Sequence, residues 1–284
     1  MPAPIQSRPV TDGARTVSPW LRFPRTVGAA ACRLFCFHHA GGSATAFRNW
    51  PVLLAPTVEV VAVQLPGREN RSVEPFEADI MRAADRIAAE IRPWASVPYF
   101  LFGHSLGASL AFEVARRLER DRAALPPAGL VVSGQQPFHL RPPPESRVHR
   151  STLDDAAFVA MLRRYNGTPS EILDNVELRE IFLPILRADF RLSESHPNDA
   201  EPVRAPLLVL GGRDDLLVPA EDLGGWRRYG LDDPEVHVLP GDHFFTRSAE
   251  PEVCALVARF IAARLASSAL SVTAGYGDGR GLLP

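Results

Sequence analysis

The chain has 284 residues, of which 46% are hydrophobic, and its 31 basic and 33 acidic residues give a formal net charge of −2. This balance excludes the basic surplus typical of nucleic-acid-binding proteins, and the length suffices for one large α/β domain with an insertion. Three cysteines are too few for a disulfide framework or a zinc site. Without a signal peptide or an apolar run of about 20 residues, we expect a cytoplasmic protein.

Residues 1–30 lack sustained periodicity and are predicted to form an irregular leader. After them, short apolar strands alternate with helical patterns, which is typical of a parallel sheet with crossover helices. The predicted strands are Leu34–His38, Val58–Gln64, Tyr99–Gly103, Gly129–Ser133, Leu207–Leu210 and Val236–Leu239. The predicted helices of this α/β core are Asp79–Arg92, Leu106–Arg122, Asp222–Tyr229 and Glu250–Ala266.

Residues 135–198 interrupt the alternation and contain no evident sheet strand. Their helical patterns are Asp154–Tyr165, Ser170–Leu173 and Asn175–Phe190. The segment is too long for a connecting loop, so we predict a helical lid over the carboxyl ends of the strands, where open α/β sheets bind ligands. The core is then 31–134 and 199–267, and a flexible tail is expected at 268–284.

The strongest motif is the pentapeptide Gly103-His104-Ser105-Leu106-Gly107, a G-x-S-x-G pattern between a predicted strand and a predicted helix. Such a turn strains the serine backbone and leaves room only for glycine two positions to either side. It would aim the Ser105 hydroxyl out of the sheet and leave the Leu106 N–H free at a helix N-terminus. A chance pentapeptide at a tight turn is the alternative. The His104 side chain should point away, which indicates a structural role.

A nucleophilic serine requires a histidine as base and a carboxylate that orients this histidine. In α/β sheets that carry the serine at such a strand–helix turn, the carboxylate follows the serine in the sequence and the histidine comes last. Two adjacent aspartates, Asp214 and Asp215, come after the strand Leu207–Leu210. The spacing G-x-x-D-x-x-V-P, counted from Gly212 and Pro219, selects Asp215. The alternative for Asp214 is a solvated turn residue.

The predicted base is His243, in the loop after the last predicted strand and just before the C-terminal helix. His237 alternates with two valines on that strand and should face outward. For the oxyanion hole, the Gly-containing loop after the first strand offers the Ala40 N–H, which we pair with the Leu106 N–H. A plain glycine turn is the alternative for this loop.

Several runs of residues resemble the type II thioesterases that accompany polyketide synthases and nonribosomal peptide synthetases. These runs are RLFCFHHAGGSATAF, VQLPGRENR, GHSLG, GGRDDLLVP and GDHFF in the core, and NGTPSEIL and LPILRADF in the predicted lid. Together with Pro19-Trp20, which also match, they span residues 19 to about 260. The lid motifs are the most informative, because generic esterases do not share them.

The resemblance implies an α/β-hydrolase fold and an editing enzyme that removes stalled or wrong acyl groups from the phosphopantetheine arm of an acyl or peptidyl carrier protein. Ser105 would attack the thioester, His243 would take its proton, and water would resolve the acyl-enzyme, with Asp215 as the acid and no cofactor or metal. The expected partner is the carrier protein, with no nucleic acid or membrane, and the protein is expected to be a monomer. The alternatives are chain release, hydrolysis of small oxygen esters, and a catalytically inactive binding module.

Two features of the resemblance leave questions open. The family usually has proline where this chain has His38, which is either a tolerated substitution at a strand end or a titratable group that tunes the pH dependence. Four lid arginines are either contacts for an acidic carrier protein or solvated surface charge. They are Arg163, Arg164, Arg187 and Arg191.

Overall fold

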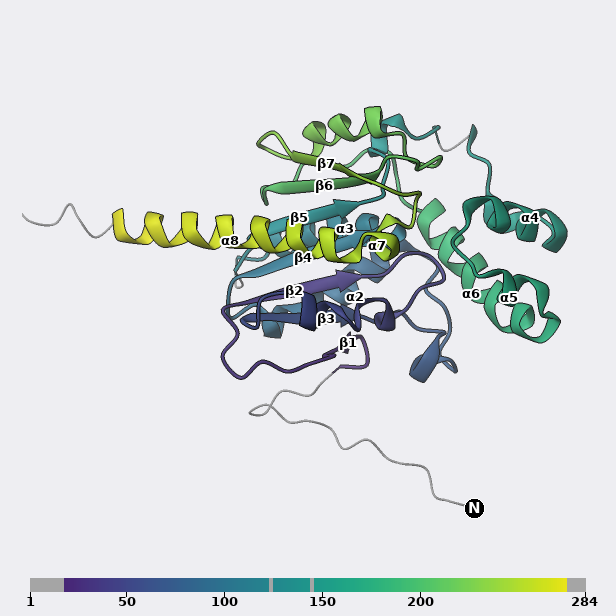
Figure 1. Cartoon of the computed structure of the whole chain (residues 1–284), viewed down its shortest axis with the longest axis horizontal. Coiled ribbons are helices and arrows are strands. Elements are labelled where there is room, and N and C mark those ends of the chain that lie inside the picture. The colour runs from purple at the N-terminus through teal and green to yellow at the C-terminus, as the bar shows by residue number, and fades with distance from the viewer. Residues whose placement is uncertain (1–17, 123–124, 144–145, 275–284) are drawn as a thin grey trace, which may run out of the picture.

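The computed structural model describes residues 18–122, 125–143 and 146–274. In these residues one sheet has the strand order β1-β3-β2-β4-β5-β6-β7 (Figure 1). Its strands are β1 (Leu21–Arg22), β2 (Cys32–Phe37), β3 (Val58–Val63), β4 (Tyr99–His104), β5 (Gly129–Ser133), β6 (Leu207–Gly212) and β7 (Glu235–Leu239). All neighbouring strands are parallel except β1 and β3. The predicted α/β architecture with a mostly parallel sheet is confirmed.

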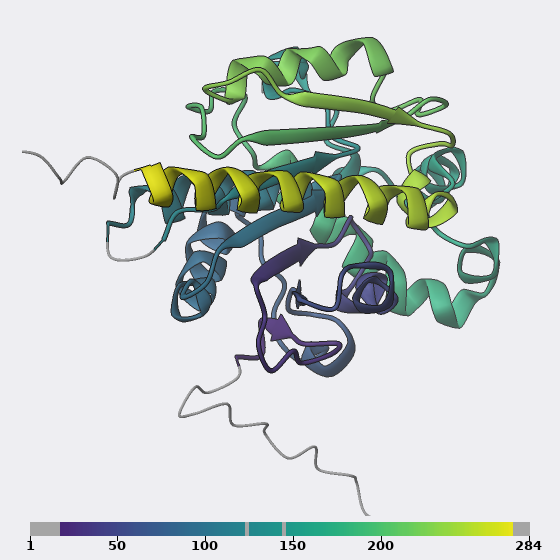
Figure 2. The same ribbon diagram turned by 60° about the vertical axis from the view of Figure 1, so that its left-hand side comes forward.

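Helices cover both faces of the sheet. On one face lie α2 (Ile80–Ile91) and α3 (Leu106–Arg120), and on the other lies α8 (Glu250–Ala274), which crosses the sheet in Figure 2. Successive strand residues alternate between the two faces, so Leu34 packs in the cluster under α8 and Phe35 in the cluster under α2 and α3. Burial on both faces explains why the central strands are continuous apolar runs.

Several further elements are short. They are α1 (Trp50–Leu53), α7 (Phe245–Ser248) and the 3₁₀ helices η1 (Ala44–Phe47), η2 (Glu69–Arg71), η3 (Arg92–Trp94), η4 (Phe138–Leu140), η6 (Arg150–Thr152) and η7 (Ala220–Tyr229). The predicted helix Asp222–Tyr229 is therefore a 3₁₀ helix. Strand β7 lies at the edge of the sheet and is mostly exposed, unlike the central strands.

Three helices between β5 and β6 lie beyond the carboxyl ends of the strands (Figure 1). They are α4 (Asp155–Tyr165), α5 (Ser170–Asp174) and α6 (Val176–Glu194). Asp154 caps α4 by accepting a hydrogen bond from the Ala157 N–H, and Asn175 caps α6 in the same way. The helices share a small apolar core of their own, formed by Phe158, Leu162, Leu173 and Leu186. We call these three helices the lid.

Two predictions at the ends of the chain need correction. The expected leader, 1–30, contains the two-residue strand β1 next to the buried Trp20, while residues 1–17 lie outside the described part. The expected tail, 268–284, begins inside α8, because its Ala- and Ser-rich start continues the helix to Ala274. Residues 275–284 are outside the described part. Among the described helices, none is long and apolar enough to cross a membrane.

Candidate active site

The turn between β4 and α3 holds Ser105 in a strained conformation, with φ 56° and ψ −119°. A Cβ added to Gly103 would lie 2.1 Å from the Gly107 carbonyl oxygen, and one added to Gly107 would lie 2.1 Å from the Phe37 carbonyl oxygen. Both contacts are with backbone, which cannot move aside. The Ser105 N–H donates to the Ser133 carbonyl on β5 at 2.8 Å, which fixes the turn to the sheet. The motif thus forms the strand–turn–helix that its sequence predicted.

Three predicted side chains form one chain of hydrogen bonds at the carboxyl edge of the sheet. His243 Nε2 lies 3.0 Å from Ser105 Oγ, and His243 Nδ1 lies 2.8 Å from Asp215 Oδ2. The other carboxylate oxygen of Asp215 accepts the N–H groups of Leu217 and Val218, at 2.8 and 3.1 Å. These bonds orient the Asp215 carboxyl group toward His243 and favour the imidazole tautomer with its proton on Nδ1, so that Nε2 faces the serine as an acceptor.

The competing residues lie outside this chain of hydrogen bonds. Asp214 is exposed, and its backbone N–H donates to the Gly241 carbonyl at 2.9 Å, away from His243. His237 lies on the exposed edge strand β7, where Nε2 is 2.7 Å from Glu235 Oε1. Geometry therefore favours Asp215 and His243 as the acid and base, as the spacing predicted.

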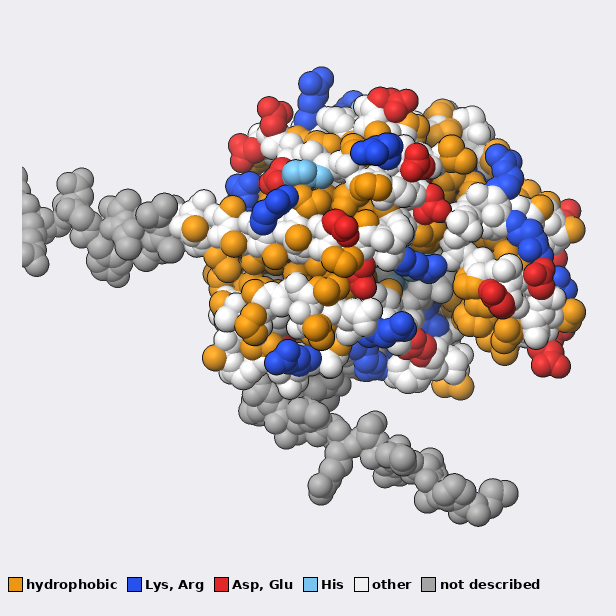
Figure 3. All heavy atoms as spheres, viewed as in Figure 1, with side chains coloured by type: hydrophobic (Ala, Val, Ile, Leu, Met, Phe, Trp, Pro, Cys, Tyr) orange, Lys and Arg blue, Asp and Glu red, His pale blue; other side chains and the backbone are white. Residues whose placement is uncertain are grey.

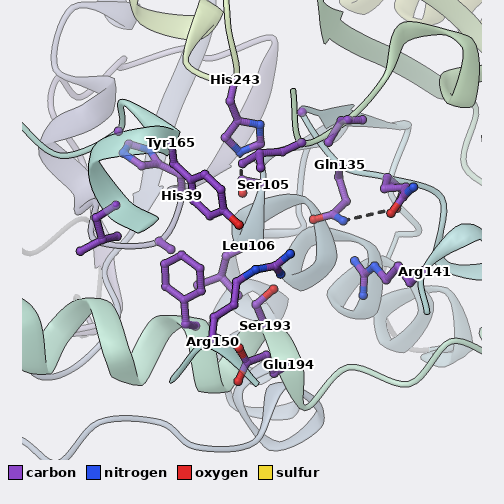
Figure 4. Close-up of a pocket in the computed structure, with 18 of the residues that line it drawn as sticks. His39, Ser105, Leu106, Gln135, Arg141, Arg150, Tyr165, Ser193, Glu194 and His243 are labelled. Carbon is purple, nitrogen blue, oxygen red and sulfur yellow. Dashed lines mark hydrogen bonds between the residues drawn. The ribbon is translucent and has the colours of Figure 1, made fainter. Parts of the chain in front are cut away.

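The predicted oxyanion donors, Ala40 and Leu106, line the same cavity as Ser105. Figure 4 shows Leu106 next to Ser105 in this cavity. The cavity has a volume of about 330 Å³. Leu106 is the first residue of α3, so its N–H has no acceptor within the helix. The next residue after Ala40, Gly41, has φ 75° and donates its N–H to Asp189 Oδ2 at 2.7 Å. The loop that carries Ala40 is thus held by a side chain of lid helix α6.

Sequence reasoning missed the partner of Asp189, which is Arg68 in the loop after β3. The two side chains form a paired bridge, with both guanidinium–carboxylate distances 2.7 Å and both groups buried. Arg68 also donates to the Gly42 carbonyl at 3.0 Å. The only signal in the sequence was that both residues lie in runs that resemble the family. We call Arg68 and Asp189 the lid bridge.

Removing the charge from the lid bridge is expected to reduce both stability and activity. In Asp189→Asn the amide keeps the shape but leaves the buried Arg68 cation without a carboxylate, which costs about 3–5 kcal/mol of unfolding free energy. The loop with Ala40 also loses an anchor, so kcat for thioester hydrolysis should fall. Urea unfolding and steady-state kinetics measure the two effects. In a matched Arg68→Met/Asp189→Leu variant, which has no unpaired charge, stability should recover in part; no recovery would contradict this account.

Three histidines at the ends of β2 and β4 are buried, and each has a lowered pKa. Desolvation, and then the charge of Arg68, lower the pKa of His38 to about 3. Desolvation, and then Arg247, lower the pKa of His39 to about 3. Desolvation, and then His243, lower the pKa of His104 well below its ordinary value. All three are therefore neutral at neutral pH.

Contacts agree with structural roles for two of these histidines. His104 Nδ1 lies 3.0 Å from Ser133 Oγ, and its ring is 5.2 Å from the ring of His243, outside the cavity that contains Ser105. His38 Nδ1 donates to the His39 carbonyl at 2.8 Å. Since His38 stays neutral, the structure favours its interpretation as a tolerated substitution over a role in tuning the pH dependence of activity.

A variant of His38 should alter the pH dependence of stability but not that of activity. In the unfolded chain His38 binds a proton when the pH falls below its ordinary pKa of 6.5. In the folded protein its pKa is about 3, so it stays neutral over the same pH range. Stability therefore falls with falling pH by about 1.4 kcal/mol per pH unit from this group. In His38→Gln the slope between about pH 5.5 and 4 should be shallower by that amount. The kcat/KM profile above about pH 6 should be unchanged; a shifted profile would restore the tuning interpretation.

The lid arginines divide into two pairs. Arg163 is ion-paired with Asp174, and Arg187 with Asp155 at 2.6 Å. Arg164 and Arg191 are exposed, and neither forms an ion pair with any of the residues 18–122, 125–143 and 146–274. In the same residues, no group of three or more His, Cys, Asp or Glu side chains is arranged to hold a metal ion.

A parallel sheet with a serine at a strand–helix turn, and a histidine and an aspartate on later loops, defines the serine hydrolases of the α/β-hydrolase fold. The sequence profile described as "Thioesterase domain" matches residues 32–262. The chain therefore belongs to the thioesterase family. This confirms the fold and the family that the motifs indicated.

Comparisons with individual proteins agree with this assignment. The chain is 37% identical over 239 residues to the gramicidin S biosynthesis protein GrsT of Aneurinibacillus migulanus, covering 84% of this chain and 91% of GrsT. It is 37% identical over 237 residues to the thioesterase PikA5 of Streptomyces venezuelae, covering 83% of each. The structure of the type II thioesterase BorB from the borrelidin biosynthetic cluster superposes with a TM-score of 0.77 at 31% identity, covering 88% of this chain and 99% of BorB.

Proposed function

We propose that this thioesterase hydrolyses stalled or aberrant acyl groups from the phosphopantetheine arm of carrier proteins in polyketide or nonribosomal peptide biosynthesis. The observation that carries the proposal is the hydrogen-bonded chain Ser105–His243–Asp215, which opens on a cavity under the lid. The similarity to GrsT, a gramicidin S biosynthesis protein, and to BorB, from the borrelidin biosynthetic cluster, supports this setting. The proposed place of action is the cytoplasm.

The geometry supports a two-step mechanism. Ser105 Oγ attacks the thioester carbonyl while His243 Nε2, 3.0 Å away, takes its proton. The N–H groups of Ala40 and Leu106 stabilise the tetrahedral oxyanion, which collapses to an acyl-enzyme and the carrier thiol. Water then attacks the acyl-enzyme with His243 as base, while Asp215 holds the imidazole in the correct tautomer. This chemistry requires no cofactor besides the arm of the substrate.

The sizes of the cavities favour editing over release of a finished chain. The cavity at Ser105, about 330 Å³, is near the lower limit for ligand pockets and suits a short acyl group. An adjoining cavity of about 1170 Å³ shares His39, Ala40 and Leu186 with it. In our proposal this larger cavity receives the phosphopantetheine arm.

For the carrier protein, we propose contacts on the lid. Carrier proteins are typically acidic, and Figure 3 shows basic side chains on the surface of the lid. Arg164 and Arg191 are the better candidates, because they are exposed and have no described ion-pair partner, whereas Arg163 and Arg187 already bind carboxylates within the lid. Exposed charges of this kind influence association rates more than affinity.

The test is hydrolysis of acetyl- and propionyl-carrier protein, followed by intact-protein mass spectrometry, with a reaction without enzyme as background. Loss of the acyl mass together with slow turnover of a finished-length acyl carrier would support editing. Fast turnover of the finished-length carrier alone would indicate chain release. If only a simple nitrophenyl ester were cleaved, the protein would be an esterase and the proposal would fail.

A further inference from the structure

The cavity at Ser105 is lined by apolar side chains and by arginines, of which Figure 4 labels Arg141 and Arg150. The apolar lining comes mainly from the lid and from the residue after His243, with Leu162, Tyr165, Leu186, Phe190 and Phe244. The three arginines come from the segment between β5 and the lid; they are Arg141, Arg147 and Arg150, whose guanidinium lies 5.9 Å from the Tyr165 ring. The thioesterase mechanism proposed above uses none of these three arginines.

Arg141 is held in place without a carboxylate. Its guanidinium donates to Ser109 Oγ at 3.0 Å, approaches His196 Nδ1 at 3.4 Å, and lies over the ring of Phe138 at 4.5 Å. No ion pair joins Arg141 to a described acidic residue. The neighbouring Arg147 donates to backbone carbonyls, among them that of His196 at 2.9 Å, and it too lacks an ion pair with the described acidic side chains.

The nearby carboxylates are bound elsewhere. Glu113 is paired with Arg116 and Arg117, and its Oε1 lies 3.2 Å from His196 Nε2. An imidazole with its proton on Nε2, toward Glu113, leaves Nδ1 free to accept from Arg141, so this network orients the guanidinium without neutralising it. Glu194, which also lines the cavity, accepts from the Ser151 hydroxyl at 2.6 Å, and its charge acts on Arg147 rather than on Arg141.

An anion would stabilise this arrangement. The Arg141 side chain is half-buried, and desolvation, followed by the charge of Arg147, lowers the pKa of its guanidinium to about 9. Desolvation also lowers the pKa of Arg147. Such shifts mean that the protein holds two neighbouring cations where water cannot fully solvate them. A bound carboxylate would offset the desolvation and form a paired, charge-assisted contact with the planar guanidinium.

The position of Arg141 indicates which part of the substrate carries the anion. Ser109, which accepts from Arg141, follows Ser105 by one turn of α3, a rise of about 6 Å. The phosphate of the phosphopantetheine arm lies at the far end of the arm from the thioester. The distal carboxylate of a short acyl group lies only a few bonds from the carbonyl that Ser105 attacks, so the acyl group is the better source of an anion in this cavity.

We propose that Arg141 forms an anion subsite for the distal carboxylate of short dicarboxylic acyl groups, such as succinyl or glutaryl thioesters. The inference rests on the proposed thioesterase function and specifies its substrate class. Hydrolysis then releases the free dicarboxylic acid and the carrier thiol, with Arg141 binding the carboxylate that does not react.

The test compares two thioesters of N-acetylcysteamine that differ only at the distal group. Succinyl thioester carries the carboxylate, and 4-oxopentanoyl thioester has a neutral ketone of the same shape; neither contains a phosphate. Wild type should prefer the succinyl substrate, and Arg141→Met should lower kcat/KM for it about 10- to 100-fold with little change for the ketone. Arg141→Lys should retain part of the preference. The matched control is Arg86→Met, an exposed arginine paired with Glu77 outside the cavity.

Each outcome separates this inference from the proposed function. Hydrolysis of both thioesters with no preference, or equal losses for both in Arg141→Met, overturns the anion subsite but leaves the thioesterase intact. No hydrolysis of either compound or of acyl-carrier protein overturns the proposed function itself. An effect of Arg141→Met on all carrier-bound substrates but on neither small thioester would place the phosphate, not the acyl carboxylate, at Arg141 and would also overturn the inference.

A second measurement uses only wild type, in case the variants fold poorly. Free succinate should inhibit hydrolysis of the neutral thioester competitively, because it can occupy the subsite as a product does. Succinamide has the same length and no carboxylate, so it should inhibit less. Equal inhibition by succinate and succinamide would contradict the subsite.

Discussion

Ser105→Ala is expected to lower kcat for acyl-carrier hydrolysis about a million-fold, the largest effect of any single substitution in this chain. The hydroxyl is the atom that forms the acyl-enzyme, and the described part of the cavity offers no second hydroxyl in hydrogen-bond contact with His243. Loss of the nucleophile therefore cannot be compensated by the base. The remaining activity would come from substrate binding and the oxyanion donors.

The structure predicts that this variant folds normally. Alanine is as compatible as serine with the strained backbone at position 105, and among the described residues Oγ is hydrogen-bonded only to His243. Wild type incubated with a slowly hydrolysed acyl group should gain the acyl mass, and Ser105→Ala should not, at unchanged melting temperature. An acyl adduct on the variant would show that another residue is the nucleophile.

Asp215→Asn is expected to lower kcat about 10⁴-fold, whereas Asp214→Asn, one residue away, should leave it nearly unchanged. An amide at position 215 presents an N–H to His243 Nδ1 and so favours the tautomer with the proton on Nε2, which cannot accept the Ser105 proton. Asp214 is exposed, and its side chain makes no hydrogen bond with the residues of this site among those described.

The two aspartate variants control for each other, because they change the same charge in the same turn. Steady-state kinetics on one acyl-carrier protein would compare them, and circular dichroism would check the fold. Similar losses in both variants would mean that the net charge of the turn matters more than the hydrogen bond to His243. A loss confined to Asp214→Asn would reverse the assignment that the G-x-x-D-x-x-V-P spacing favours.

Local sequence signals predicted the central part of the site because local sterics determine it. Gly103 and Gly107 flank the serine because added Cβ atoms would collide with backbone, and this requirement is visible in a pentapeptide. Asp215 and His243 follow strands β6 and β7, and parallel strands bring their following loops to one edge of the sheet. The assignment of catalytic roles to these residues remains a prediction.

Interactions between distant segments could not be predicted in the same way. Arg68 and Asp189 are far apart in sequence, and neither residue type nor spacing indicates that they meet in the buried lid bridge. Arg141 lies in a Pro-rich segment without periodicity, so nothing in the sequence places it against Ser109. The two-residue strand β1 is too short to produce an alternating pattern.

The lid bridge also limits which lids this core can accept in evolution or in protein engineering. Suppose that α6 is replaced by the helix of a relative that has no acidic residue equivalent to Asp189. The buried Arg68 cation would then lose its carboxylate, and the Gly41 N–H would lose its acceptor. A functional chimera must therefore transfer both halves of the bridge or neither. The lid residues that face the substrate can vary independently, but Asp189 has to be kept together with Arg68 in the loop after β3.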